Sequence, residues 1–104
     1  MTDAPLFLYT TRPGRLGMLT EGPTEEEARI VSAHFDYLEG LAAQGVLLLA
    51  GRTQDADATT FGIVLFQAAG ESEARAIMKN DPAVRHGVML GELHPYRIAI
   101  RGRL

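Results

Sequence analysis

His34 is the residue in this 104-residue sequence best suited to carry chemistry, because it interrupts a set of apolar residues that recur at helical spacing. At about 100° per residue, His34 projects close to Leu38 and Leu41. The apolar residues of this segment are Ala28, Val31, Phe35, Leu38, Leu41 and Ala42. Imidazole titrates near neutral pH, so a histidine in a pocket can act as a general acid or base. The alternative is a core histidine with one structural hydrogen bond, since burying an unpaired polar ring is costly.

An Asp-Pro pair further along the chain supplies a candidate partner for this histidine. Asp81 before Pro82 is typical of a helix N-cap with proline in the first turn, and a short helix over residues 82–85 would use it in that way. The functional interpretation is a carboxylate that fixes the tautomer of His34 and stabilises its protonated form, as in catalytic triads. A single carboxylate can do both.

Other candidate site residues are weaker. Arg12 and Arg52 are candidate contacts for an anionic substrate, although either could be plain surface charge, and Gly51 is a candidate wall residue of the same pocket. The three histidines lie far apart and show no metal-ligand spacing, and no glycine-rich nucleotide-binding motif is present. The sequence therefore predicts neither a metal site nor a cofactor.

Composition narrows the class of protein. The net charge of −3 gives no electrostatic reason to expect binding to nucleic acid or to an anionic membrane. Cysteine is absent, so disulfides and thiolate metal sites are excluded. No apolar run approaches the roughly 20 residues of a membrane helix, and no signal-peptide pattern opens the chain. We expect a single domain over residues 1–104 in the cytoplasm.

The elements that must position His34 and Asp81 follow from hydrophobic periodicity and turn residues. Strands are predicted at residues 6–10, 46–50 and 61–67, with a final extended segment at 88–100. A helix is predicted between a capping box, Thr24 with Glu27, and a left-handed Gly45, and a second helix over residues 71–80. A glycine- and proline-rich loop over residues 12–23 should border the pocket. This βαββαβ order predicts an α+β, ferredoxin-like sandwich.

Two of the predicted strands are apolar without alternation, which indicates that both faces of the sheet need cover. Two helices can cover one face, and nothing else in the chain can cover the other. Large exposed apolar faces are rare on monomers, so a homodimer is expected.

The sequence resembles the YCII-related (YciI-like) family. The resemblance rests on HFDYLEGLAAQGVLLLAG from His34 onward and on MKNDPAVRHGV around Asp81, and it extends over residues 6–100. It implies a dimeric α/β barrel of ferredoxin-like chains, with a pocket between each sheet and its helices. It also implies a His–Asp active pair, which falls on His34 and Asp81. Family members of known chemistry include a dehydrochlorinase that acts on a chlorinated hydroxyquinol.

The chain departs from the family pattern at two places. Many members have Gly-Pro where this chain has Gly51-Arg52, and many have an aromatic residue at the position of Ala83. Both differences alter a pocket wall, so the substrate does not carry over. We expect a lyase or isomerase acting on a small aromatic or enol-forming anion, with His34 moving a proton and Asp81 orienting it. The alternative is a non-catalytic module that binds a metabolite or another protein.

Overall fold

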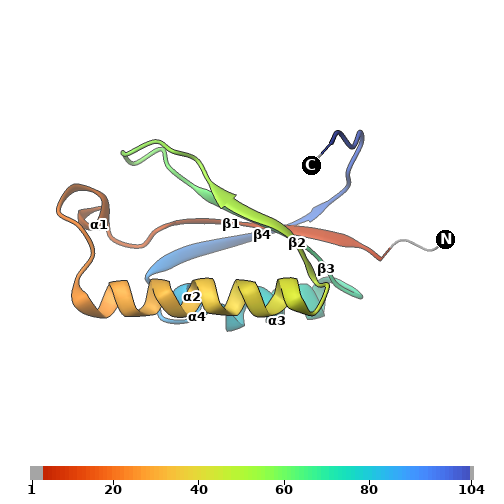
Figure 1. The fold of residues 1–104 in the computed structure, drawn as a ribbon, viewed down its shortest axis with the longest axis horizontal. Coiled ribbons are helices and arrows are strands. Elements are labelled where there is room, and N and C mark those ends of the chain that lie inside the picture. Colours follow the sequence, from red (N-terminus) through yellow and green to blue (C-terminus); the bar gives the residue numbers. More distant parts are fainter. Residues whose placement is uncertain (1–3, 104) are drawn as a thin grey trace.

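The computed structural model describes residues 4–103, so both ends of the predicted domain, residues 1–3 and 104, lie outside it. Its elements are β1 (Leu6–Pro13), α1 (Gly17–Thr20), α2 (Glu25–Ala43), β2 (Leu47–Arg52), β3 (Gly62–Gln67), α3 (Glu71–Asn80), α4 (Pro82–Arg85) and β4 (Met89–Tyr96). The strands form one antiparallel sheet in the order β2-β3-β1-β4. Figure 1 shows α2, α3 and α4 on one side of this sheet. The α+β class is confirmed, and the arrangement is compatible with a ferredoxin-like fold.

The long helix α2 begins and ends as its residues predict. Thr24 accepts a hydrogen bond from the Glu27 backbone while the Glu27 side chain bonds the Thr24 backbone, which completes the capping box. Gly45 has a φ of 76°, the left-handed conformation that glycine adopts most readily. The residues buried by α2 are His34, Leu38 and Leu41.

The predicted apolar face of α2 was wrong in one part. The Phe35 side chain is 57% exposed, and Ala28 and Ala42 are exposed as well. His34 lies one turn before Leu38 and two turns before Leu41, so these three residues share one side of the helix and face the core. Phe35, one position further along, does not face the core. The Phe35 ring instead lies beside that of His34, with the ring centres 5.3 Å apart.

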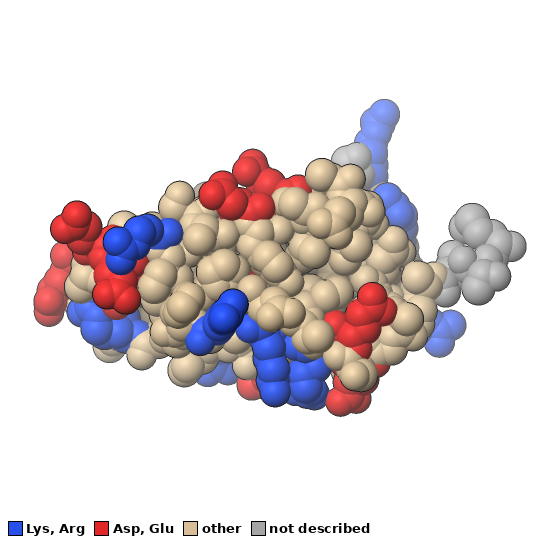
Figure 2. Space-filling view, turned by 90° about the horizontal axis from the view of Figure 1, so that it is seen from below, with Lys and Arg blue, Asp and Glu red and all other residues tan. Residues whose placement is uncertain are grey.

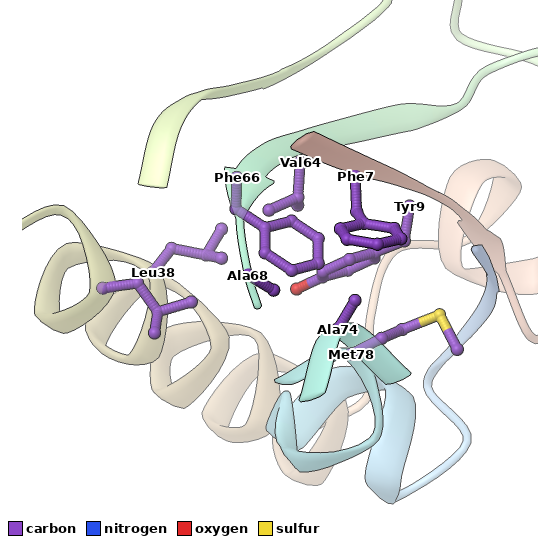
Figure 3. Packing of buried hydrophobic residues seen from close by; sticks show 9 residues of the cluster. Phe7, Tyr9, Leu38, Val64, Phe66, Ala68, Ala74 and Met78 are labelled. Carbon is purple, nitrogen blue, oxygen red and sulfur yellow. The ribbon is translucent and has the colours of Figure 1, made fainter. Parts of the chain in front are cut away.

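The core lies between the sheet and the helices. On β1 and β3 the paired residues Phe7 and Phe66, and Tyr9 and Val64, point toward the helices. Figure 3 shows these side chains meeting Leu38 of α2 and the α3 residues Ala74 and Met78. Side chains alternate between the two faces of a strand, so this register also fixes which β1 residues can reach the site.

Several boundaries differ from those predicted: β2, for example, runs over Leu47–Arg52 instead of residues 46–50. β1 continues through Arg12 to Pro13, which were expected in the loop, because both pair with β4. The rest of that loop contains the short helix α1. The last strand ends at Tyr96 instead of continuing to residue 100, and its Pro95 is tolerated because β4 is an edge strand with β1 as its neighbour.

Charged side chains form no extended patch of one sign on the helical face of the molecule. Figure 2 shows this face with acidic and basic groups scattered in small clusters around an uncharged centre. None of the helices within residues 4–103 is long and apolar enough to cross a membrane.

The opposite face of the sheet carries no helix among the described residues (Figure 1). Alternation places Leu8, Ile63 and Leu65 on this face, opposite Phe7 and Tyr9. On the neighbouring strand β4 it places Leu90, which is 61% exposed, and Tyr96, which is 44% exposed. We refer to this surface as the outer face.

Candidate active site

The structure brings His34 and Asp81 into direct contact although 47 residues separate them. The Nδ1 atom of His34 lies 2.7 Å from Oδ1 and 2.8 Å from Oδ2 of Asp81. His34 comes from the middle of α2, and Asp81 from the junction between α3 and α4, where those two helices pack against each other. A carboxylate in this position favours the tautomer that carries its proton on Nδ1, because that nitrogen can then donate.

Asp81 also does the structural work that its sequence position predicted. Its Oδ1 accepts a hydrogen bond of 3.0 Å from the Ala83 backbone, which caps α4. Its Oδ2 accepts one of 2.7 Å from the Tyr9 hydroxyl, a partner that sequence patterns did not reveal. The Asp81 side chain is 0% exposed, so these donors take the place of water. Buried carboxylates persist as charges only when they are bonded in this way.

Tyr9 serves this cluster as a hydrogen-bond donor. Burial, followed by the nearby Asp81 charge and the hydrogen bond to it, raises the pKa of the Tyr9 hydroxyl well above its usual value. The hydroxyl therefore keeps its proton over the whole neutral range. Tyr9 could have been suspected from sequence only through a general argument: it shares a strand face with Phe7, and a buried tyrosine hydroxyl needs a partner.

Replacement of Tyr9 by phenylalanine is expected to lower the free energy of unfolding by about 1.5–3 kcal/mol, because a buried charged acceptor loses a donor. Urea unfolding at neutral pH measures this change. Tyr37→Phe is the matched control, since the Tyr37 hydroxyl donates to the neutral Ile77 carbonyl and should cost only about 0.5–1.5 kcal/mol. Equal losses in the two variants would contradict a charged Asp81.

A cavity of about 590 Å³ lies beside His34. It is bounded by the inner side of the sheet, by α2 and by the segment that contains α1, and most of its lining is apolar. Among the described residues the Nε2 atom of His34 makes no hydrogen bond, yet no side-chain nitrogen or oxygen hidden from solvent lacks a partner. Nε2 is therefore reachable by solvent, and His34 lines this cavity. The ring has one nitrogen bonded to Asp81 and one available to a bound molecule.

The three residues proposed from sequence as substrate contacts, Arg12, Gly51 and Arg52, all line this cavity. They are not equivalent. Arg52 pairs with Gly62, which is opposite the inward-facing Thr11, so alternation places Arg52 on the side of His34. Arg12 has the other parity and also borders a second hollow of about 380 Å³, together with Thr10, Glu92 and His94. Arg52 is therefore the better placed of the two to contact a ligand beside His34.

The segment predicted to border the pocket does so through Met18, Leu19 and Pro23. An ion pair fixes it to α2: Arg15 Nη2 lies 2.7 Å from Glu27 Oε1, and Arg15 Nε lies 3.0 Å from Oε2. The hydrogen bond from Arg15, then that from the Thr24 backbone, lowers the pKa of Glu27 to about 2. One carboxylate thus caps α2 and anchors the edge of the cavity.

The cavity wall contains residues that sequence patterns did not identify. Thr11, Thr60 and Phe61 all line it. Nothing in their local spacing marks them, because their proximity to His34 depends on how α2 crosses the sheet. Within residues 4–103, no group of three or more histidine or acidic side chains is arranged to hold a metal ion.

The chain is thus a small α+β domain in which a helix-borne histidine, held by the Asp of an Asp-Pro cap, lies beside a cavity on an antiparallel sheet. Residues 6–91 match the model of the YCII-related domain, and the chain belongs to that family. The family resemblance inferred from the sequence is thereby confirmed.

Among solved structures, the chain is similar to 5-chloro-2-hydroxyhydroquinone dehydrochlorinase from Burkholderia phenoliruptrix AC1100, determined in complex with 2,5-dihydroxybenzoquinone. The two are 24% identical, with a TM-score of 0.64, and the match covers 88% of this chain and 93% of the other. At that identity the likeness concerns the fold. No curated protein matches the sequence significantly.

Proposed function

We propose that this protein is a small-molecule enzyme of lyase or isomerase type in which His34 transfers a proton and Asp81 orients it. The observation that carries the proposal is the placement of one imidazole between a buried carboxylate, 2.7 Å from Nδ1, and an open cavity of about 590 Å³. A histidine with a single structural bond would not need an adjacent cavity. The available Nε2 is the atom that would exchange the proton.

The proposed step begins with Nε2 of a neutral His34 removing a proton from the substrate. The electron pair of the broken bond forms an enolate or expels a leaving group, and Asp81 stabilises the imidazolium that results. In an isomerisation the same proton returns at another atom; in an elimination it leaves with the departing anion as the acid. Neither route needs a cofactor to supply or accept electrons.

The substrate in this proposal is a small aromatic or enol-forming anion. The cavity volume falls in the range of small-molecule sites, and its mainly apolar wall suits a ring. Arg52, and Arg12 at the margin, would compensate the negative charge. The dehydrochlorinase that shares the fold acts on a chlorinated hydroxyhydroquinone, which belongs to this chemical class.

We further propose that two copies of the chain pair through their outer faces as a homodimeric α/β barrel. The support is the set of apolar side chains on a sheet face that no described helix covers, including exposed Leu90 and Tyr96, which lie among polar ones such as Thr10 and Glu92. Burying such a face against a second copy is the simplest way to remove it from water.

The enzymatic proposal is tested by incubating the protein with 5-chloro-2-hydroxyhydroquinone and measuring chloride release, and with small unsaturated lactones in D₂O, measuring deuterium incorporation by NMR. Turnover by the native protein and not by His34→Gln supports the proposal. Tight binding of 2,5-dihydroxybenzoquinone without turnover of any compound would favour the non-catalytic alternative. Turnover that survives in His34→Gln would contradict the assigned role.

A further inference from the structure

Thr11 carries a buried hydroxyl that the protein itself does not use. Thr11 lies on the inner face of β1, two residues beyond Tyr9, and is 7% exposed. Within the described part of the chain its hydroxyl makes no hydrogen bond, and no fully hidden side-chain oxygen lacks a partner. The hydroxyl is therefore open to solvent on one side, and that side is the cavity that Thr11 lines together with His34. Buried polar groups are normally bonded, so an open one in a cavity indicates a ligand contact.

Gly62 keeps this hydroxyl accessible. It is the direct partner of Thr11 on β3 and also lines the cavity. A Cβ atom at Gly62 would lie 2.6 Å from Thr11 Oγ1 and 3.2 Å from the Gly51 carbonyl oxygen. The backbone at Gly62 does not have a positive φ, so any residue could adopt its conformation. The missing side chain, and not backbone freedom, is what leaves room beside Thr11.

The opening lies on the β3 side of Thr11. On the other side Thr11 pairs with Gly91 of β4, and a Cβ there would meet Met78 Sδ at 3.1 Å and Val84 Cγ2 at 3.2 Å. Core side chains from α3 and α4 thus fill the space over Gly91. Over Gly62 the nearest atoms are Thr11 Oγ1 itself, the Gly51 carbonyl oxygen and, at 3.8 Å, the Cβ of Arg52, so no core side chain from the helices covers the Thr11 hydroxyl there. We call the space bounded by Thr11, Gly62 and Gly51 the Thr11 recess.

We propose that the Thr11 recess binds an oxygen substituent of the substrate, so that the substrate class narrows to hydroxylated or oxo-substituted ring anions. The inference rests on the proposed function of His34. A strand rises about 3.3 Å per residue, so Thr11 lies roughly 7 Å along β1 from Tyr9, whose hydroxyl shares Asp81 with His34. Thr11 and His34 line the same cavity, so a ring bound there can face Nε2 with one side and the recess with another. The threonine hydroxyl can donate to a carbonyl or oxyanion, or accept from a hydroxyl.

Binding of benzoate, 3-hydroxybenzoate and 4-hydroxybenzoate, measured by calorimetry, tests the recess without knowledge of the natural substrate. One hydrogen bond corresponds to about a three- to tenfold difference in affinity. The native protein should bind at least one hydroxybenzoate tighter than benzoate by that factor. Thr11→Val should abolish the difference, Thr11→Ser should restore it, and Thr10→Val, on the opposite face of the same strand, should not affect it.

Two further measurements separate a binding role from a structural one. Thr11→Val should leave the melting temperature unchanged, because the hydroxyl has no partner in the protein. Gly62→Ala, which keeps Thr11 but fills the recess, should also remove the preference for the hydroxybenzoate. A melting temperature that falls with uniform weakening of all three probes would overturn the inference in favour of a structural threonine.

The binding measurements distinguish an error in the recess from an error in the proposed function. A hydroxybenzoate preference that persists in Thr11→Val and Gly62→Ala, or its absence from the native protein, overturns the recess alone. If none of the ring acids binds and none perturbs the NMR signals of His34, the proposed substrate class is wrong and the recess is wrong with it.

Discussion

Asp81→Asn is expected to reduce turnover by about 10²–10⁴-fold while the protein remains folded. Asparagine keeps the shape of the side chain and can still accept the hydrogen bond that caps α4, because asparagine is itself a good N-cap. It removes the charge that stabilises the imidazolium formed on His34 during proton transfer. General acid–base catalysis contributes a factor of this size, and a triad aspartate changed to asparagine has a comparable effect.

NMR of the His34 ring nitrogens measures the same coupling without a substrate. The native ring should carry its proton on Nδ1, and in Asp81→Asn the chemical shifts of Nδ1 and Nε2 should change because Nδ1 loses its carboxylate partner. The signals of His86 and His94, which are exposed, serve as internal references. Superimposable His34 ring-nitrogen signals in the two proteins would contradict the contact and leave the catalytic proposal without a mechanism.

A double variant provides the kinetic control. His34 and Asp81 are predicted to act as one unit, so His34→Gln combined with Asp81→Asn should be no slower than His34→Gln alone. Additive losses would show that Asp81 affects turnover by a route other than His34.

Leu8→Asp is expected to convert a dimer into a folded monomer. Leu8 occupies the outer face of the central strand β1, between Leu65 of β3 and His94 of β4. An interface over this face should bury on the order of 2,000 Å² or more in total, and a carboxylate at its centre would have to lose its hydration for the interface to form. Light scattering at low micromolar concentration should report twice the 11.3 kDa chain mass for the native protein and the single mass for the variant.

Two other substitutions keep this test interpretable. Ser32→Asp, on the exposed side of α2, should leave the dimer intact. Val64→Asp, which places a carboxylate within the core between sheet and helices, should unfold the chain, since an unpaired buried charge costs a large part of a typical stability of about 5–15 kcal/mol. A native protein of monomer mass would contradict the dimer directly.

Sequence reasoning succeeded for features determined by residues close together in the chain. The Thr24–Glu27 capping box, the left-handed Gly45 and the Asp81 cap of α4 all depend on contacts within a few positions. The contact between His34 and Asp81 was also predicted, although it spans two packed helices, because a buried ring demands a partner and the family resemblance supplied one.

The features that sequence reasoning missed depend on crossing angles and register. Tyr9 and Asp81 are 72 residues apart in the chain, and they meet only because β1 lies against the helices at the point where α3 joins α4. Thr11 is open to the cavity only because its β3 partner is Gly62. Phe35 was included in the apolar face of α2 because a spacing of three or four residues does not tell which of two adjacent positions faces the core. No local pattern encodes these relations.

The two hydrogen bonds that Glu27 Oε1 accepts make the stability of the cavity edge depend on pH. Its Oε1 receives both the Thr24 backbone bond that starts α2 and the Arg15 bond that holds the segment beside the cavity. Conditions that release this carboxylate therefore loosen this edge of the cavity and fray the start of α2 together. The pKa of Glu27 is lowered to about 2, so its stabilising contribution is complete above the ordinary value near 4.5 and is lost as pH falls toward 2. Mild acidity would leave this edge of the cavity unchanged, whereas Arg15→Gln would loosen it and keep the Thr24–Glu27 capping box.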